Sequence, residues 1–150
     1  MIQSILVAVD GSQAAGRALD LAGEVAAAVG AAVTLLHVQA RPGRETVPEE
    51  LAIFARTEHV ELTEAQARRE IGEELLRRAE SRARAAGVAS VASALEIGDP
   101  AGVIAEHAKV NGAHLIVMGR RGLGTIGGLL LGSVSHKVTQ LAPCACMTVP

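Results

Sequence analysis

Short apolar runs alternate with segments of helical periodicity along the whole chain. Each run has about the length of a β-strand, and each intervening segment is long enough for a helix. This alternation predicts an α/β domain in which a parallel sheet is covered by helices on both faces. The length of 150 residues, with 49% apolar residues, suits a single domain, 1–150. The expected strands are Ile5–Val9, Val33–Val38, Val91–Ile97, Leu115–Met118 and Cys144–Val149.

Local signals mark the ends of four helices between these strands. Ser12 is expected to cap the first helix, and Gly30 is expected to end it. Such signals are typical because a helix begins with unpaired N–H groups and ends with unpaired carbonyls. The other helices are predicted from the capping-box pair Thr63 and Gln66 to Gly87, from Asp99-Pro100 to Val110, and from Gly132-Ser133 to about Leu141.

The second of these helices has two distinct faces. Its apolar stripe predicts burial of Ile71, Leu75, Ala79, Ala83 and Ala86. The opposite face has charges at i,i+4 spacing, which is typical of a solvated surface. The expected ion pairs are Glu64/Arg68, Glu73/Arg77, Glu74/Arg78 and Glu80/Arg84.

Composition excludes several classes of function. Phe54 is the only aromatic residue, and the formal net charge is −2, so stacking on nucleic-acid bases and an overall basic footprint are both absent. The first apolar run ends at Asp10 without a basic region before it, and no run reaches the length of a membrane span. Two cysteines make no disulfide framework. We expect a cytoplasmic protein that binds neither nucleic acid nor membrane.

A glycine-rich loop follows the fourth predicted strand. It contains six of the sixteen glycines, between Gly119 and Gly132, and it lies in a segment without Asp or Glu that extends from His107 to the last residue. Arg120 and Arg121 stand at the start of the loop. Bare backbone and positive charge together favour a bound phosphate.

Three phosphate motifs can be compared with this loop. A Walker A string does not occur. A Gly-x-Gly-x-x-Gly string begins at Gly122, but it follows the fourth strand, and no acidic residue follows it to bind a ribose. The third arrangement uses two glycine corners, Gly119 with Gly122 and then Gly132 with Ser133 at a helix N-terminus, where N–H groups attract anions. This last arrangement predicts a polyphosphate site.

The same spacing, Gly119-x2-Gly122-x9-Gly132-Ser133, resembles the ATP-binding signature of the universal stress protein family. The strings ILVAVDGS, LLHV, GDP, LIVMGRRG and LLGSVS look like further landmarks of that family. The resemblance covers the whole chain. It implies an open five-stranded parallel sheet of order 3-2-1-4-5, of the Rossmann-like, adenine nucleotide alpha hydrolase-like class, and a homodimer.

The resemblance also implies a binding site at the carboxyl ends of the first and fourth strands, where ligands bind in such sheets. The cofactors implied are ATP and Mg²⁺, and Asp10 is the candidate metal ligand, because Mg²⁺ often joins carboxylates to phosphates. The adenosine side would be contacted by Ala8, Asp10 and Val38, and the ribose and phosphates by Gly119, Gly122, Gly132, Ser133 and Val134. Met118 and Arg121 are further candidate residues for binding the nucleotide.

Simpler alternatives stand beside these roles. The glycine-rich segment can be a surface connection without a ligand, and Asp10 can cap the helix that follows it, beside Ser12. Cys144 and Cys146 are expected to pack in the last strand or at a dimer seam, with redox sensing as the alternative. The five histidines lack metal-ligand spacing and are expected to be core or surface residues: His37, His59, His107, His114 and His136.

Three functions therefore compete. The first is a nucleotide-dependent regulatory protein of the stress response, the second a slow ATPase or phosphotransferase that uses the same site, and the third a dimerisation module without a ligand. No candidate base, catalytic lysine or triad accompanies the loop, which favours binding over catalysis. The uncharged last strand, Cys144–Val149, is expected at a sheet edge and predicts the homodimer contact.

Overall fold

The computed structural model describes residues 1–41, 64–123 and 132–150. These residues form a five-stranded parallel sheet of order β3-β2-β1-β4-β5, which is the predicted order. The strands are β1 Ser4–Ala8, β2 Ala32–Gln39, β3 Val91–Ile97, β4 Leu115–Gly119 and β5 Ala145–Val149, and the helices are α1 Gln13–Val29, α3 Glu64–Ala85, α4 Pro100–Val110 and α5 Ser133–Leu141.

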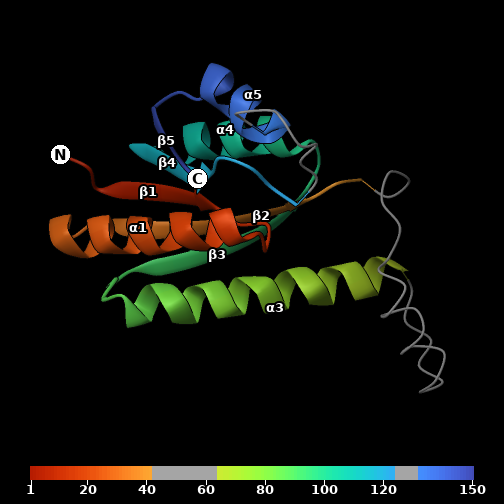
Figure 1. Ribbon diagram of the computed structural model, residues 1–150, viewed down its shortest axis with the longest axis horizontal. Helices are drawn as coiled ribbons and strands as arrows, with labels where there is room; N and C mark the ends of the chain where they lie inside the picture. Colours follow the sequence, from red (N-terminus) through yellow and green to blue (C-terminus); the bar gives the residue numbers. More distant parts are fainter. Residues whose placement is uncertain (42–63, 124–131) are drawn as a thin grey trace.

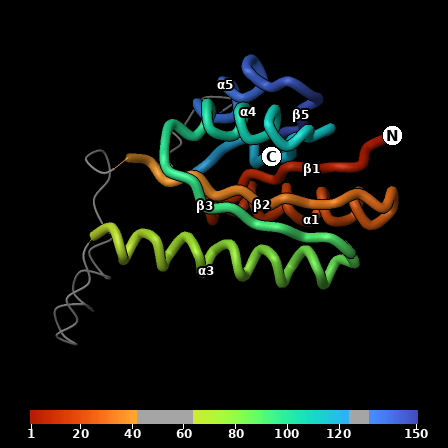
Figure 2. The backbone as a smooth tube through the Cα atoms, turned by 180° about the vertical axis from the view of Figure 1, so that it is seen from behind, coloured from red at the N-terminus to blue at the C-terminus, as the bar shows by residue number. Residues whose placement is uncertain are grey.

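Helices cover both faces of the sheet (Figure 1). Alternate side chains of β1 divide between two cores, because successive residues of a strand point to opposite faces. Ile5 and Val7 pack with α1 and α3, whereas Leu6 packs with α4 and α5. The view from behind shows the same layers, with α4 and α5 on one side of the sheet and α3 on the other (Figure 2). The prediction of helices on both faces is confirmed.

The predicted helix ends are largely confirmed. Ser12 Oγ accepts a hydrogen bond from Ala15 N at 3.1 Å, and Asp99 caps α4 by accepting one from Gly102 N at 3.2 Å. Gly30 ends α1 with a φ of 70°, in the left-handed region that favours glycine. Thr63, the first residue of the predicted capping box, lies outside the described residues.

The prediction for α3 is partly wrong. Ile71 is 39% exposed, and Ala86 is also exposed, so neither belongs to the buried stripe. The helix instead turns slightly different positions toward the core, because it packs against both α1 and the sheet. Its buried residues are Ala67, Gly72, Leu76, Ala79 and Ala83.

Two of the four expected ion pairs of α3 are also wrong. Glu64/Arg68 and Glu74/Arg78 are present, at 3.0 and 2.5 Å. Glu73, however, pairs with Arg69, and Arg77 pairs with Glu74. Glu80 and Arg84 bond instead to Ser93 and to the carbonyl of Val91 on β3. Contacts with the neighbouring strand therefore compete with those along the helix.

Among residues 1–41, 64–123 and 132–150, no helix combines the length and the apolar character that crossing a membrane requires.

Candidate functional site

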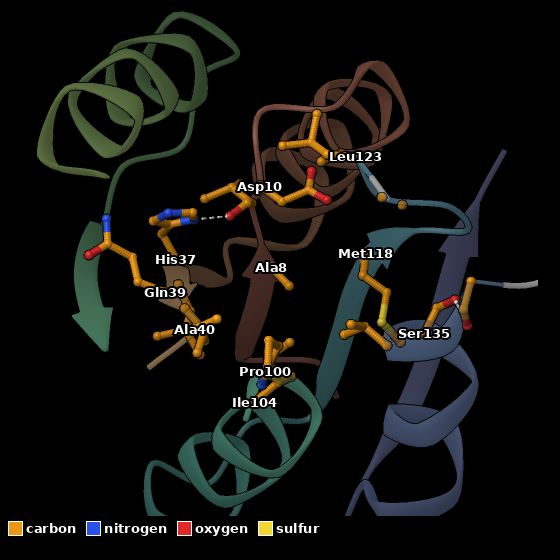
Figure 3. Close-up of a pocket in the computed structure, with 18 of the residues that line it drawn as sticks. Ala8, Asp10, His37, Gln39, Ala40, Pro100, Ile104, Met118, Leu123 and Ser135 are labelled. Atoms are coloured by element: carbon orange, nitrogen blue, oxygen red, sulfur yellow. Dashed lines mark hydrogen bonds between the residues drawn. The ribbon is translucent and has the colours of Figure 1, made fainter. Parts of the chain in front are cut away.

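A cavity of about 560 Å³ lies at the carboxyl ends of β1, β2 and β4 (Figure 3). β2 lies on one side of β1 and β4 lies on the other side. The connections that follow β1 and β4 therefore lead away from each other at this end of the sheet. Ligands bind at such a switch point in open parallel sheets because the diverging loops leave a crevice between them. The volume is within the usual range of small-molecule sites.

Apolar side chains form the wall of this cavity on the side of α4 and α5. Ala8, Val38 and Met118 come from the three central strands, and Pro100 and Ile104 come from α4. Met118 is 3% exposed and Ile104 is 4% exposed, so both are fixed by packing. Such a wall is suited to the face of a flat organic ring.

The glycine corners are close together, and each lacks a side chain for a steric reason. A Cβ on Gly119 would lie 2.8 Å from Ala15 N, and a Cβ on Gly132 would lie 3.1 Å from the carbonyl oxygen of Arg120. A Cβ on Gly122 would lie 2.6 Å from Asp10 Oδ2. None of the three has a φ in the left-handed region. Close approach of other groups, and not backbone strain, therefore disfavours a side chain here, most strongly at Gly119, where backbone atoms of α1 lie within 3 Å of the added Cβ.

Ser135 connects the two ends of the glycine-rich segment. Its hydroxyl lies 2.8 Å from the carbonyl oxygen of Arg120 and 3.1 Å from that of Gly132, and Gly132 N donates to the Arg120 carbonyl at 2.8 Å. The serine is 3% exposed, and it also lines the cavity. Ser135 was not among the predicted site residues, although it lies two positions after Ser133.

The N-terminus of α5 opens into the cavity without a side-chain cap. α1 and α4 are capped by Ser12 and Asp99, whereas α5 has Gly132 as its N-cap, and no side chain among the described residues makes a cap hydrogen bond there. Gly132, Ser133 and Val134 all line the cavity. Helix N-termini carry unpaired N–H groups and about half a positive charge, which together favour an anion.

Asp10 is the only carboxylate among the described residues that line the cavity. Its Oδ1 accepts a hydrogen bond from Ser12 N at 2.9 Å, an i,i+2 contact, while the N-cap of α1 is Ser12 itself. No group of three His, Cys, Asp or Glu side chains in the described part of the chain is placed to hold a metal ion. One carboxylate fits a Mg²⁺ ion whose other ligands are phosphates and water, but it does not make an independent metal site.

Arg121 is the one candidate site residue that does not line the cavity. The Nε atoms of Arg120 and Arg121 are buried and have no hydrogen-bond partner among the residues that the structure describes. The other nine candidates lie together at the cavity: Ala8, Asp10, Val38, Met118, Gly119, Gly122, Gly132, Ser133 and Val134.

The cavity also extends around the end of β2 toward α3, and sequence reasoning missed this part. Its wall is formed by His37, Gln39, Arg68, Ile71 and Leu75. The i,i+4 spacing of Ile71 and Leu75 was a usable signal, but it was interpreted as core packing. The exposure of Ile71 has its explanation here, because its side chain lines the cavity.

The two cysteines lie away from this cavity: Cys146 is on β5, and Cys144 directly precedes that strand. Both are partly buried beside the core under α4 and α5. Burial raises the pKa of both thiols, and the neighbouring Cys144 raises that of Cys146 further. A raised pKa lowers the fraction of reactive thiolate, which favours packing over redox sensing.

Comparison with known proteins identifies the family. The family model described as the universal stress protein family matches residues 1–150. The chain belongs to the universal stress protein family. It is 36% identical to universal stress protein YxiE of Bacillus subtilis, with 99% of each chain covered, and 40% identical to a universal stress protein of Thermus aquaticus, also with 99% of each covered.

Solved structures of universal stress proteins share the fold. The protein from Lactobacillus plantarum matches with a TM-score of 0.78 at 24% identity, covering 99% of this chain and 98% of its own. A universal stress protein in complex with cAMP matches with a TM-score of 0.71 at 28% identity, covering 99% and 97%. The protein from Archaeoglobus fulgidus in complex with dAMP matches with a TM-score of 0.68 at 28% identity, covering all of both chains.

Proposed function

We propose that this universal stress protein binds ATP, together with Mg²⁺, and acts as a nucleotide-dependent regulatory protein. The observation that carries the proposal is the uncapped N-terminus of α5, which opens into a cavity at the switch point of the sheet. An anionic group placed there would meet N–H donors that no side chain of the helix satisfies. The apolar wall beside it is suited to a base.

The candidate residues would contact different parts of the ligand at the two ends of the cavity. Ala8, Asp10, Val38 and Met118 would contact the adenosine side, because they come from the ends of the central strands. The ribose and phosphates would lie against the residues around the loop that line the cavity: Gly119, Gly122, Gly132, Ser133 and Val134. Arg121 is a candidate from the sequence alone, because it does not line the cavity. Asp10 would hold Mg²⁺ through its carboxylate, and the metal would neutralise phosphate charge.

Two relatives of known structure support an adenine nucleotide. The structural neighbours that bind cAMP and dAMP are 28% identical to this chain, and their matches cover almost all of it. Both ligands combine an adenine base with a phosphate, which corresponds to the apolar wall and the α5 N-terminus of this cavity.

Calorimetric titration of the purified protein with ATP and with NAD, each in the presence of Mg²⁺, tests the proposal. ATP is expected to bind much more tightly, because the downstream acidic residue of a dinucleotide site is missing. Tighter binding of NAD would contradict the assignment. Phosphate release is measured in the same samples, since steady turnover would favour the ATPase or phosphotransferase.

We further propose a homodimer through β5. This strand lies at the edge of the sheet, and its residues Ala145–Val149 carry neither charge nor proline. An unprotected edge exposes unpaired N–H and C=O groups. Pairing of two such edges across a two-fold axis would satisfy both.

A further inference from the structure

Ser135 is a buried hydroxyl in the first turn of α5, beside the cavity (Figure 3). It is 3% exposed, and no other polar or charged side chain of residues 1–41, 64–123 and 132–150 is buried as deeply. Removal of a hydroxyl from water costs free energy unless the group is hydrogen-bonded. Serine is therefore favoured over alanine at this position only by the bonds that its hydroxyl makes.

The Ser135 hydroxyl has two carbonyl acceptors within reach. Its Oγ lies 2.8 Å from the Arg120 oxygen and 3.1 Å from the Gly132 oxygen, but a hydroxyl has only one proton to donate. Each of the two oxygens also accepts one backbone N–H, Arg120 from Gly132 and Gly132 from His136. The shorter distance therefore assigns the proton of Ser135 to the Arg120 carbonyl.

The backbone of Arg120 is itself anchored to the sheet. Arg120 N donates to the Val149 carbonyl at the end of β5 at 2.6 Å, and the Arg120 carbonyl accepts from Gly132 N at 2.8 Å. With Ser135 as the second donor, both lone pairs of the Arg120 oxygen are occupied. Ser135 and Gly132 thus hold the first turn of α5 against the ends of β4 and β5.

These bonds determine which N–H groups a ligand can reach. Gly132 N is used within the protein, whereas the N–H groups of Ser133, Val134 and Ser135 make no bond to another described residue. The first N–H groups of a helix have no intrahelical acceptor. All three residues line the cavity. A phosphate that approaches α5 would therefore meet three donors, and the Arg120 contact fixes their position.

We propose that Ser135 is a positioning residue for the phosphates: its hydroxyl holds the Arg120 carbonyl and so fixes the N–H groups of the first turn of α5 at the cavity. This inference rests on the proposed nucleotide binding and adds a residue that acts without touching the ligand. Without the hydroxyl, the Arg120 oxygen keeps only the Gly132 donor, and the first turn of α5 has to be ordered when the phosphates bind. Loss of this one bond lowers the affinity for ATP by about fivefold and leaves the affinity for adenosine unchanged.

Calorimetric titrations of Ser135→Ala with ATP and with adenosine, each in the presence of Mg²⁺, test this proposal. The two ligands share the base and the ribose, so the ratio of their affinities isolates the contribution of the phosphates. We expect the ATP to adenosine affinity ratio to fall about fivefold in Ser135→Ala.

Thr139→Val is the matched control for this experiment. The Thr139 hydroxyl donates to the His136 carbonyl at 2.7 Å, three residues back in the same helix, but Thr139 does not line the cavity. The control therefore removes a hydroxyl bond of α5 and leaves the Arg120 contact in place. It is expected to keep the wild-type ratio.

Several results would overturn the proposal. An unchanged ratio in Ser135→Ala would do so, and equal losses of ATP and adenosine affinity would mean that Ser135 only stabilises the fold. An equally lowered ratio in Thr139→Val would assign the effect to the stability of α5 and not to the Arg120 contact. Wild-type protein that binds ATP and adenosine equally would exclude the proposal without any variant, whereas wild-type protein that binds neither would exclude the proposed function as well.

Discussion

Replacement of Gly119 by alanine is expected to destabilise the fold and not only the loop. The new Cβ would lie 2.8 Å from Ala15 N, 2.9 Å from the carbonyl carbon of Ala14 and 2.9 Å from Ala14 Cβ. Two of these atoms belong to the backbone of α1, so no rotation of a side chain relieves the contacts. Ala14 and Ala15 are 7% and 4% exposed, and the end of β4 would have to separate from the start of α1.

The expected loss of unfolding free energy follows from the cost of adding a methyl group to a closely packed core. Overpacking of this kind costs about 1–3 kcal/mol. In a domain of this size each kcal/mol lowers Tm by about 2–4 °C, so the middle of the range corresponds to a decrease of roughly 4–8 °C. The backbone φ of Gly119 lies outside the left-handed region, so no further term for strain is added.

Urea and thermal unfolding followed by far-UV circular dichroism measure this loss. Gly122→Ala is the matched control, because among the described residues its Cβ would approach only the Asp10 carboxylate, which is the end of a side chain. We expect a smaller loss of unfolding free energy in the control than in Gly119→Ala. Equal stability of Gly119→Ala and the wild type, or a larger loss in the control, would refute the steric argument.

Three further changes test the site, the edge strand and the cysteines. Gly122→Val should abolish ATP binding in a folded protein, because the branched side chain would displace the Asp10 carboxylate, and unchanged affinity in calorimetry would exclude the loop as the phosphate site. Met147→Lys should convert a dimer to a monomer in light scattering, while Met147→Leu, which keeps the packing of Met147 on the core, should not; a dimer of unchanged affinity in Met147→Lys would place the interface elsewhere. Alkylation of Cys144 and Cys146 near neutral pH should be slower than that of a cysteine in an unfolded peptide, since only the thiolate reacts. The alkylation rate should rise as the pH approaches the raised pKa values, and rates equal to those of the peptide would contradict the effect of burial.

The order of elements could be predicted because its signals are local. The strand Val91–Ile97 and the helix limits at Pro100, Val110 and Leu141 are found as expected, since apolar runs, a Pro at the first helical position and a cap are properties of neighbouring residues. The sheet order came from the family resemblance. It brings nine of the ten candidate site residues to one cavity.

The parts that sequence reasoning missed depend on contacts between distant segments. Ile71 has the spacing of a core residue, but it lines the cavity at the carboxyl ends of the strands and is 39% exposed. Glu80 was expected to pair with Arg84, but its carboxylate accepts a hydrogen bond from the Ser93 hydroxyl on β3. His37 is one of three polar residues of β2, and only the fold shows that the carbonyl of Val9 fixes its tautomer.

The central position of β1 has a consequence for synthesis on the ribosome. β1 can pair with β2 soon after both have been synthesised. Its other edge pairs with β4, at Ile5 and Leu115, and this pairing requires that β4 has also been synthesised. At about 5–20 residues per second, this edge stays without its partner for roughly 5–20 s. The wall formed by β4 and α5 is missing during that interval, so a ligand of the cavity cannot assist folding of the nascent N-terminal half. It can stabilise only a chain whose last third has been synthesised.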